Sequence, residues 1–361
     1  MPSSRDARFL CDLCGAGLTD PPPLWRCPCG GPLSVQGPRA LDPRALAGRP
    51  PSLWRYREAM ALDPGIEPIT LGEGMTPVVL RQVAGLEALF KLEMLNPTGS
   101  FKDRGACVVA SEMRARGVRQ AVEDSSGNAG AALAAYGSRA GIEMQIVAPE
   151  GAPAPKLMAI TGAGGHLTCV PGGRAAAGEE ALRRAASGME FASHLWNPWF
   201  MEGTRTFAYE VWEQTEGRLP ERVFFPVGNG SLLIGAASGF DDLVAWSLAS
   251  RSPRLMAVQA LACAPLVPGA PAPGATVADG IRIPAPPRAR RMRAVVEASG
   301  GAFTGVSEAE ILEARAALGR AGLAVEPTSA VAFAGALAWC RSRPGEPAPL
   351  VALTGTGLKV P

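Results

Sequence analysis

The sequence NPTGSFKDRG, residues 96–105, decides the fold of this chain. Asn-Pro and the following Gly predict a turn, and residues 106–116 predict a helix behind it. Small residues on both sides of Lys102 leave room for a flat group. Lysine is scarce, because only four occur, at Lys91, Lys102, Lys156 and Lys359. A lysine in this position can form a Schiff base with an aldehyde, although a lone lysine beside a turn is more often a plain surface residue.

Two glycine-rich loops follow the lysine segment. The first is DSSGNAG, residues 124–130, and it leads into a helix of small residues. The second is GNGS, residues 228–231, which stands between an apolar run and another predicted helix. Backbone N–H groups at such helix starts suit a carboxylate or a phosphate. Either loop alone is weak support, since many strand-to-helix turns are glycine-rich for packing reasons.

Five motifs in a fixed order give the chain its resemblance. SFKDRGA, SSGNAG, PVGNGS, EPTSA and LTGTGLK together resemble the threonine synthase branch of the fold-type-II pyridoxal-phosphate enzymes, from about residue 70 to the end. The resemblance implies pyridoxal 5'-phosphate as the cofactor, bound covalently by Lys102. It also implies that Asn128 binds the phenolic oxygen of the cofactor and that Thr354 faces its pyridine nitrogen.

The remaining cofactor and substrate contacts are also implied by the resemblance. The phosphate group of the cofactor is expected to lie on a turn without lysine or arginine, formed by Val227, Gly228, Asn229, Gly230, Ser231 and Leu232. The substrate carboxylate is expected to lie on the first loop, against Ser125, Ser126, Gly127 and Ala129. A hydroxyl at Thr354 cannot hold a proton on the ring nitrogen as a carboxylate can. This favours elimination and replacement at Cβ over transamination.

Three positions depart from the pattern of the familiar threonine synthases. Residues that bind the substrate phosphate are expected where this chain has Ala129, Leu195 and Phe200. Either Arg205 or His194 replaces the lost ligands, or the natural substrate carries no phosphate. For His194, a role as a plain wall of the pocket is about as favoured as a role as a ligand.

Four of the eight cysteines lie within the first thirty residues. The spacing C-x2-C, followed by C-P-C-G-G, predicts a small zinc-ribbon-like knuckle formed by Cys11, Cys14, Cys27 and Cys29. Disulfides are the alternative, and a reducing compartment disfavours them. The other four cysteines, Cys107, Cys169, Cys263 and Cys340, stand in apolar surroundings and are predicted to be buried.

The composition predicts a globular enzyme. Of the 361 residues, 47% are hydrophobic and 19% are charged, and the formal net charge is +2. This charge gives no indication of nucleic acid or an anionic membrane as a partner. The N-terminus lacks the apolar core of a secretion signal, so a cytoplasmic location is expected. The expected partner is a small amino-acid substrate, and the resemblance implies a homodimer.

Alternating helices and short apolar runs predict an α/β fold with two lobes, each a mostly parallel sheet covered by helices. The predicted parts are a Cys-rich head at 1–35, an arm and the start of the large lobe at 36–95, the small lobe at 96–195, and the rest of the large lobe at 196–361. A Pro-rich loop is predicted at 264–293. Glu326 is interpreted as the cap of the helix that follows it.

Three functions are compatible with these residues. The leading one is a threonine synthase-like lyase that converts O-phosphohomoserine and water to threonine and phosphate. The second is a β-eliminating or β-replacing enzyme acting on serine, threonine or an activated serine. The third is a non-catalytic regulator that kept the cofactor fold, which the presence of Lys102, Asn128 and Thr354 disfavours.

Overall fold

The computed structural model describes residues 8–359, so the first seven residues of the predicted head lie outside it. The chain forms two compact units. Unit 1 comprises residues 1–74 and 102–206, and unit 2 comprises residues 75–101 and 207–361. The domain boundaries expected at 35, 95 and 195 stay a prediction.

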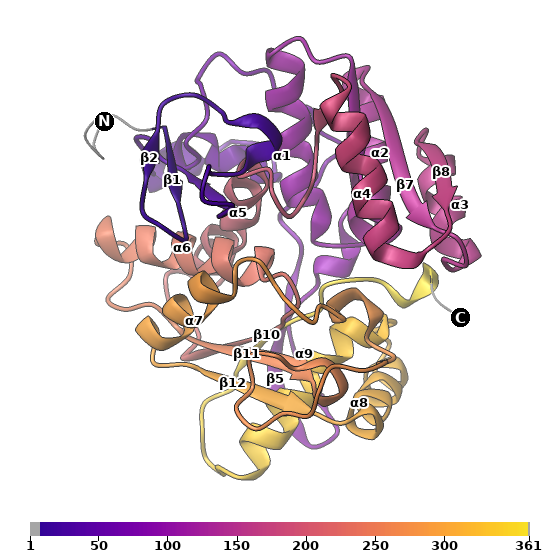
Figure 1. Cartoon of the computed structure of the whole chain (residues 1–361). Coiled ribbons are helices and arrows are strands. Elements are labelled where there is room, and N and C mark those ends of the chain that lie inside the picture. Colours follow the sequence, from indigo (N-terminus) through magenta and orange to yellow (C-terminus); the bar gives the residue numbers. More distant parts are fainter. Residues whose placement is uncertain (1–7, 360–361) are drawn as a thin grey trace. The chain divides into compact units, whose positions relative to one another are not determined.

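Unit 1 is built on a four-stranded parallel sheet in the order β8-β7-β6-β9. Its strands are β6 (Gln120–Glu123), β7 (Glu143–Pro149), β8 (His166–Val170) and β9 (Glu190–Phe191). Its helices are α1 (Lys102–Ala115), α2 (Asn128–Ala140), α3 (Ala154–Gly162), α4 (Gly173–Ala186) and the first half of α5 (Trp199–Gln214). Helix α4 packs along β7 and β8, and α3 lies against β8 (Figure 1).

The order of these strands locates the ligand edge of unit 1. From β6 the chain continues to β7 and β8 on one side, and it then returns to place β9 on the other side. In such sheets, ligands bind at the carboxyl ends of the strands where the strand order reverses. In unit 1 this point lies between the ends of β6 and β9.

The Cys-rich head is a small antiparallel sheet in the order β2-β1-β3. Its strands are β1 (Phe9–Cys11), β2 (Gly17–Leu18) and β3 (Leu33–Val35). Short 3₁₀ helices follow at Pro23–Trp25, Pro43–Leu46 and Leu53–Ala59. Phe9 packs edge-on against Trp199 of α5, with the ring centroids 6.2 Å apart. The head therefore shares the apolar core of unit 1.

Unit 2 contains a six-stranded sheet in the order β12-β11-β10-β13-β5-β4, parallel except for the edge strand β4. The strands are β4 (Val78–Val83), β5 (Leu86–Lys91), β10 (Arg222–Pro226), β11 (Arg254–Ala260), β12 (Ala302–Val306) and β13 (Leu350–Ala352). The helices are α6 (Ser231–Ala245), α7 (Ala289–Ala298), α8 (Glu308–Arg320) and α9 (Pro327–Arg341), with 3₁₀ turns at Glu93–Leu95, Leu261–Cys263, Asp279–Ile281 and Gly357–Lys359.

The sheet of unit 2 is buried on both faces. Helix α9 packs on β10, β11, β12 and β13 and carries α8 beside it, while α6 and α7 pack against β11 (Figure 1). Successive side chains of β10 point to opposite faces. Phe224 joins the cluster under α9, whereas Phe225 contacts Phe207 at 5.4 Å between centroids. This explains why β10 reads as a continuous apolar run.

The predicted α/β class with parallel-rich sheets is confirmed, and three details are corrected. The predicted loop 264–293 ends early, because α7 begins at Ala289. Cys169 is exposed rather than buried, since β8 is an edge strand. Glu326 stands at the N-cap position of α9, but its side chain makes no capping hydrogen bond. The N–H of Ser329, which a cap would bind, already donates to the carbonyl of Glu326.

Candidate active site

Lys102 is the first residue of α1 and lies beside an aromatic ring. Its Nζ is 5.6 Å from the centroid of Phe200, which is fully buried. Helices α1 and α5 approach closely here through two glycines. A Cβ on Gly105 would lie 2.4 Å from the Phe200 ring, and one on Gly203 would lie 1.7 Å from the carbonyl oxygen of Arg104. Only glycine fits these positions, so the packing fixes where Lys102 begins its helix.

The SSGNAG loop leaves β6 and becomes the first turn of α2. Gly127 is the N-cap residue of α2, and its N–H donates to Oγ of Ser125 at 3.3 Å. A Cβ on Gly130 would lie 1.9 Å from the carbonyl oxygen of Ser125, so the loop folds back tightly over the helix start. The first N–H groups of a helix have no partner inside it. The loop is therefore suited to an anion, as the resemblance implies for residues 125–129.

A buried acid–imidazole pair lies at the edge where β6 and β9 end. Nδ1 of His194 is 2.5 Å from Oε1 of Glu123, and the backbone N–H of His194 donates to Oε2 of the same carboxyl at 3.2 Å. Glu123 is fully buried and His194 is 6% exposed. Burial is the main cause that raises the pKa of Glu123 to about 8. Burial also holds the pKa of His194 well below its ordinary value.

Sequence analysis missed Glu123 altogether and treated His194 as a ligand or a pocket wall. The available signal was an acidic residue that closes an apolar strand immediately before the SSGNAG loop. Its partner lies 71 positions away in the sequence. The pairing of β6 with β9 brings the two together.

In unit 2, the second glycine-rich loop joins β10 to α6. A Cβ on Gly228 would lie 2.8 Å from Cα of Ile281, and Gly230 has a φ of +76° that favours glycine. The loop therefore delivers backbone N–H groups to the start of a 15-residue helix. Val227 contributes no N–H, because its amide donates to Val258 within the sheet. Residues 228–232 stand at a helix start, where backbone N–H groups suit a phosphate, and their binding to the cofactor phosphate stays a prediction.

Thr354 lies beyond β13, whose neighbour in the sheet is β10. Its hydroxyl is 3.2 Å from the hydroxyl of Ser329, and both side chains are buried. Ser329 accepts a hydrogen bond from the N–H of Gly355 at 2.7 Å, which fixes its position. The carbonyl of Thr354 accepts the N–H of Phe101, the residue before Lys102. Unit 2 thus brings the GNGS turn, Thr354 and the segment leading to Lys102 to one edge of its sheet.

The residues expected to replace the missing phosphate ligands are engaged elsewhere. Arg205 forms an ion pair with Glu202 at 3.1 Å, and the same carboxylate binds Arg39 at 2.8 Å. These positive charges lower the pKa of the buried Glu202, against the effect of its burial. His194 is bound to Glu123. Arg205 and His194 therefore both already have a carboxylate partner, and neither offers a positive charge that is not already paired.

The four cysteines of the head come together. Sγ of Cys11 lies 3.6 Å from that of Cys29, and Sγ of Cys14 lies 3.7 Å from that of Cys27. All four sulfurs lie within 4.8 Å of one another. Disulfide-bonded sulfurs are about 2.05 Å apart, so the arrangement is that of four free thiols around one point. Two tight turns create it, with the N–H of Gly15 donating to Cys11 and that of Gly30 to Cys27.

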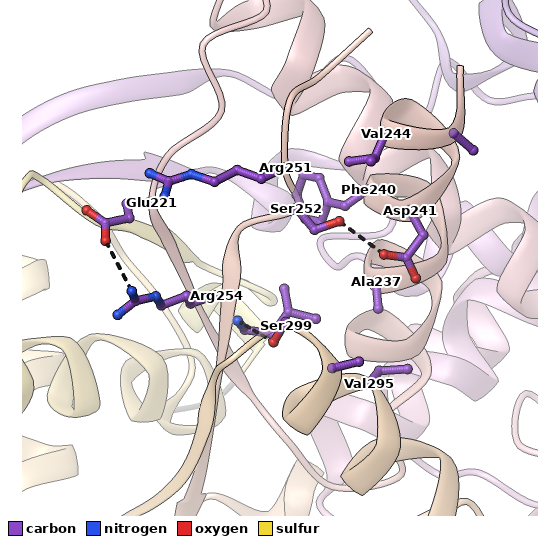
Figure 2. A pocket seen from close by; sticks show the side chains of 13 residues that line it. Glu221, Ala237, Phe240, Asp241, Val244, Arg251, Ser252, Arg254, Val295 and Ser299 are labelled. Atoms are coloured by element: carbon purple, nitrogen blue, oxygen red, sulfur yellow. Dashed lines mark hydrogen bonds and ion pairs between the residues drawn. The ribbon is translucent and has the colours of Figure 1, made fainter. Parts of the chain in front are cut away.

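A separate pocket of about 570 Å³ lies in unit 2 and is shown in Figure 2. Its charges pair locally, since Arg254 approaches Glu221 at 4.0 Å and Ser252 donates to Asp241 at 3.0 Å. Arg254 begins β11, so the pocket lies at the amino ends of the strands. The GNGS turn and Thr354 follow the carboxyl ends of the strands. This pocket is therefore not the candidate site.

The described residues fit pyridoxal phosphate in their chemistry. They include an amine at Lys102, a glycine turn at a helix start that is cradled by Ile281, and a buried hydroxyl pair at Thr354 and Ser329. These groups match an aldehyde, a phosphate and a ring nitrogen, respectively. Whether each named residue binds the cofactor stays a prediction.

Comparisons with known proteins identify the family. Residues 69–355 match the model of the family described as pyridoxal-phosphate dependent enzyme. The threonine synthase of Methanosarcina acetivorans is 32% identical over 347 residues, covering 90% of this chain and 85% of that protein. The threonine synthase of Mycobacterium leprae is 35% identical over 290 residues, covering 78% and 80%.

Solved structures share the fold. Serine racemase from Dictyostelium discoideum superposes with a TM-score of 0.66 at 26% identity, covering 79% of this chain and 93% of that one. An O-ureido-L-serine synthase gives a TM-score of 0.70 at 24% identity, covering 79% and 90%. The chain therefore belongs to the pyridoxal-phosphate dependent enzyme family, as a lyase of its threonine synthase-like branch.

Proposed function

We propose that this lyase converts O-phosphohomoserine and water to threonine and phosphate. The threonine synthases that match most of the chain support the substrate. The observation that carries the reaction class is the hydroxyl pair at Thr354 and Ser329. A hydroxyl does not hold a positive charge on the ring nitrogen. The moderate electron demand that results suits elimination and addition at Cβ and Cγ.

In this proposal each group of the chain has one task. Bound pyridoxal phosphate supplies an electron-withdrawing ring that stabilises negative charge next to the substrate amine. Lys102 would hold the cofactor aldehyde, and its amine would move protons at Cα and Cβ of the substrate. The N–H groups at the start of α2 bind the substrate carboxylate. Those at the start of α6 bind the cofactor phosphate.

The test is a product assay on purified protein loaded with pyridoxal phosphate. We expect O-phosphohomoserine to give threonine and inorganic phosphate in equal amounts, and Lys102→Ala to give neither. Lys156→Ala is the matched control and should retain activity. Borohydride should fix the cofactor to Lys102. Reduced cofactor on another lysine would reject the assignment.

A second candidate function is favoured by one observation, which is the ion pair between Arg205 and Glu202. Ala129, Leu195 and Phe200 also lack polar groups, which favours a substrate without phosphate. The reaction would then be elimination from serine, threonine or an activated serine. Formation of a 2-oxo acid from these amino acids, without phosphate release from O-phosphohomoserine, would identify it. Loss of phosphate release in Arg205→Ala would favour the first candidate instead.

We also propose that the head binds one structural zinc ion. Four thiolates at about 2.3 Å from a tetrahedral zinc lie about 3.8 Å apart, close to the 3.6 and 3.7 Å of the two cysteine pairs. One zinc per chain is expected by elemental analysis. Replacing Cys27 and Cys29 with Ser should remove the metal and lower stability, while the rate per folded active site changes little. Metal-free protein of unchanged stability would contradict this.

Location and assembly are part of the proposal. Among residues 8–359, no helix is both long and apolar enough to cross a membrane. All eight cysteines, which lie within those residues, are free thiols, as is usual in a reducing compartment. We propose a cytoplasmic homodimer that acts on a small amino acid without nucleic acid or membrane as a partner. Light scattering of the purified protein tests its assembly.

A further inference from the structure

The buried Glu123–His194 pair has no task in the reaction described above. It lies at the ends of β6 and β9, where the strand order of unit 1 reverses. The carboxyl binds both the ring and the backbone N–H of His194. One contact would orient the ring, and the second makes the pair a rigid unit. A buried group of this kind at a ligand edge is a candidate for function.

The pair shares its surroundings with Lys102. The His194 ring packs edge-on against Phe200 at 6.0 Å between centroids, and Nζ of Lys102 lies 5.6 Å from the same ring. The charge of Lys102 acts on both members of the pair. The ring that both groups contact is fully buried. Charges in a buried apolar setting interact more strongly than charges in water.

We propose that Glu123 and His194 hold one exchangeable proton between them and that its presence favours the neutral amine of Lys102. With the proton, the pair has no net charge. Without it, the pair carries one negative charge and favours the ammonium form of Lys102. The two residues act through Lys102, so they are positioning residues. This inference rests on the proposed role of Lys102 as the cofactor lysine.

The charges around the pair set where it loses the proton. Burial raises the pKa of Glu123 to about 8, and the opposing influences include the backbone N–H of His194, Lys102 and Arg174. Asp124 faces the pair from the loop after β6, and its own pKa is raised by burial and by Glu123. Arg26 faces Asp124 from the head. We therefore expect the pair to keep the proton at neutral pH and to release it near pH 8.

Loss of the shared proton can be observed because it changes which ring nitrogen of His194 carries hydrogen. When Oε1 of Glu123 is ionised, Nδ1 of His194 must carry hydrogen, and Nε2 is left with a lone pair. When the carboxyl is protonated, it donates to Nδ1, and Nε2 carries the hydrogen. Loss of one proton to solvent thus moves hydrogen from one ring nitrogen to the other. The step is balanced, with one proton released and one negative charge gained.

The experiment uses the full chain labelled with ¹⁵N-histidine and free of cofactor. The sequence contains only two histidines, and the exposed His166 gives the reference signal in the same spectrum. We expect the ring nitrogens of His194 to exchange their tautomer in one transition near pH 8. Glu123→Gln should abolish that transition. Lys102→Met should raise its midpoint by at least ~0.5 pH unit, whereas Lys156→Met should leave it unchanged.

Two results would overturn the inference. One is a His194 transition that persists in Glu123→Gln, and the other is a midpoint that ignores Lys102→Met. A second measurement follows the attachment of pyridoxal phosphate by absorbance between pH 6 and 10. Glu123→Gln mimics the protonated pair, so its rate should match the parent within ~2-fold at pH 7 and lose the inflection near pH 8. Neither measurement uses an amino-acid substrate, so failure to form threonine would reject only the proposed function.

Discussion

Unit 1 buries the Glu123–His194 pair and unit 2 buries the Lys91–Glu210 pair, and the two pairs differ in how their hydrogen bonds are completed. In unit 2, Nζ of Lys91 donates to Glu210 at 2.7 Å, to the carbonyl of Thr76 at 2.5 Å and to Gln214 at 2.9 Å. All three ammonium hydrogens are therefore used. In unit 1, the Glu123 carboxyl accepts the backbone N–H of His194 and meets its ring in one short contact, in which the proton has two possible positions.

This difference separates a structural pair from a functional one. A fully saturated ammonium–carboxylate pair has one stable arrangement, and removing either partner leaves a buried charge. The Glu123–His194 pair has two arrangements that differ by one proton, and it changes from one to the other near pH 8. Burial alone does not indicate function. A buried pair that can change its charge without losing its partner does.

The largest effect is expected from the lysine that belongs to neither pair. Lys102→Ala should lower turnover by at least ~10³-fold, because no other amine stands at the start of α1. Circular dichroism and the melting temperature should remain close to those of the parent. Residual turnover that free amines such as ethylamine fail to increase would argue against a chemical role for Lys102.

Breaking the structural pair should affect stability instead. Lys91→Met leaves Glu210 buried without its cation, which should cost about 3–5 kcal/mol of unfolding free energy. Urea unfolding measures this loss. The KM of protein that remains folded should not change. A double variant, Lys91→Met with Glu210→Leu, should recover most of the loss, and failure to do so would mean that the pair is not the cause.

The functional pair should be recognised by the pH dependence of stability. The pKa of Glu123 is about 8 in the folded protein, compared with an ordinary value of 4.5 in the unfolded chain. Between these two pH values the folded state holds a proton that the unfolded state has released. The contribution of Glu123 to the free energy of unfolding is therefore fully present below pH 4.5. It falls by up to about 1.4 kcal/mol per pH unit as the pH rises to about 8. Glu123→Gln should flatten this slope, and urea unfolding at several pH values measures it. An unchanged slope would contradict the raised pKa.

A smaller effect is expected at the hydroxyl pair. Thr354→Ser keeps the hydroxyl beside Ser329 and should change kcat by less than ~10-fold, because only a methyl group is lost. Thr354→Asp should instead favour a charged ring nitrogen and increase side reactions such as transamination. Product analysis distinguishes the two variants. Equal product ratios in both would remove the electronic argument for elimination.

The local pattern of the sequence predicted much of this molecule. The helix predicted at 106–116 lies within or at the end of α1 (Lys102–Ala115), and the helix of small residues predicted after the SSGNAG loop is α2 (Asn128–Ala140). The two glycine loops stand at helix starts as expected. The four head cysteines meet because their spacing and turns are local. Each of these features depends on neighbours within a short stretch of chain.

The features that sequence analysis missed depend on distant contacts. Glu123 meets His194 only because β9 pairs with β6, and their altered pKa values arise from burial, which no motif encodes. Arg205 pairs with Glu202 one helical turn away on α5, which sequence analysis did not foresee, and its expected contact with the substrate stays a prediction. The sequence does show this possible ion pair, because Glu202 and Arg205 are three positions apart, a spacing that places two residues side by side on a helix. The substrate, by contrast, depends on side chains brought together from several elements.

The packing of Phe9 on Trp199 has a consequence for the synthesis of the chain. Phe9 of the first strand also packs on the nearby Trp25, but its contact with Trp199 forms only when a residue roughly 190 positions later has left the ribosome. At about 5–20 residues per second, this takes roughly 10–40 s. During that interval the four thiols of Cys11, Cys14, Cys27 and Cys29 stand on a head without its final packing. For the zinc site proposed above, the time at which the ion becomes available should then matter for folding as well as its concentration.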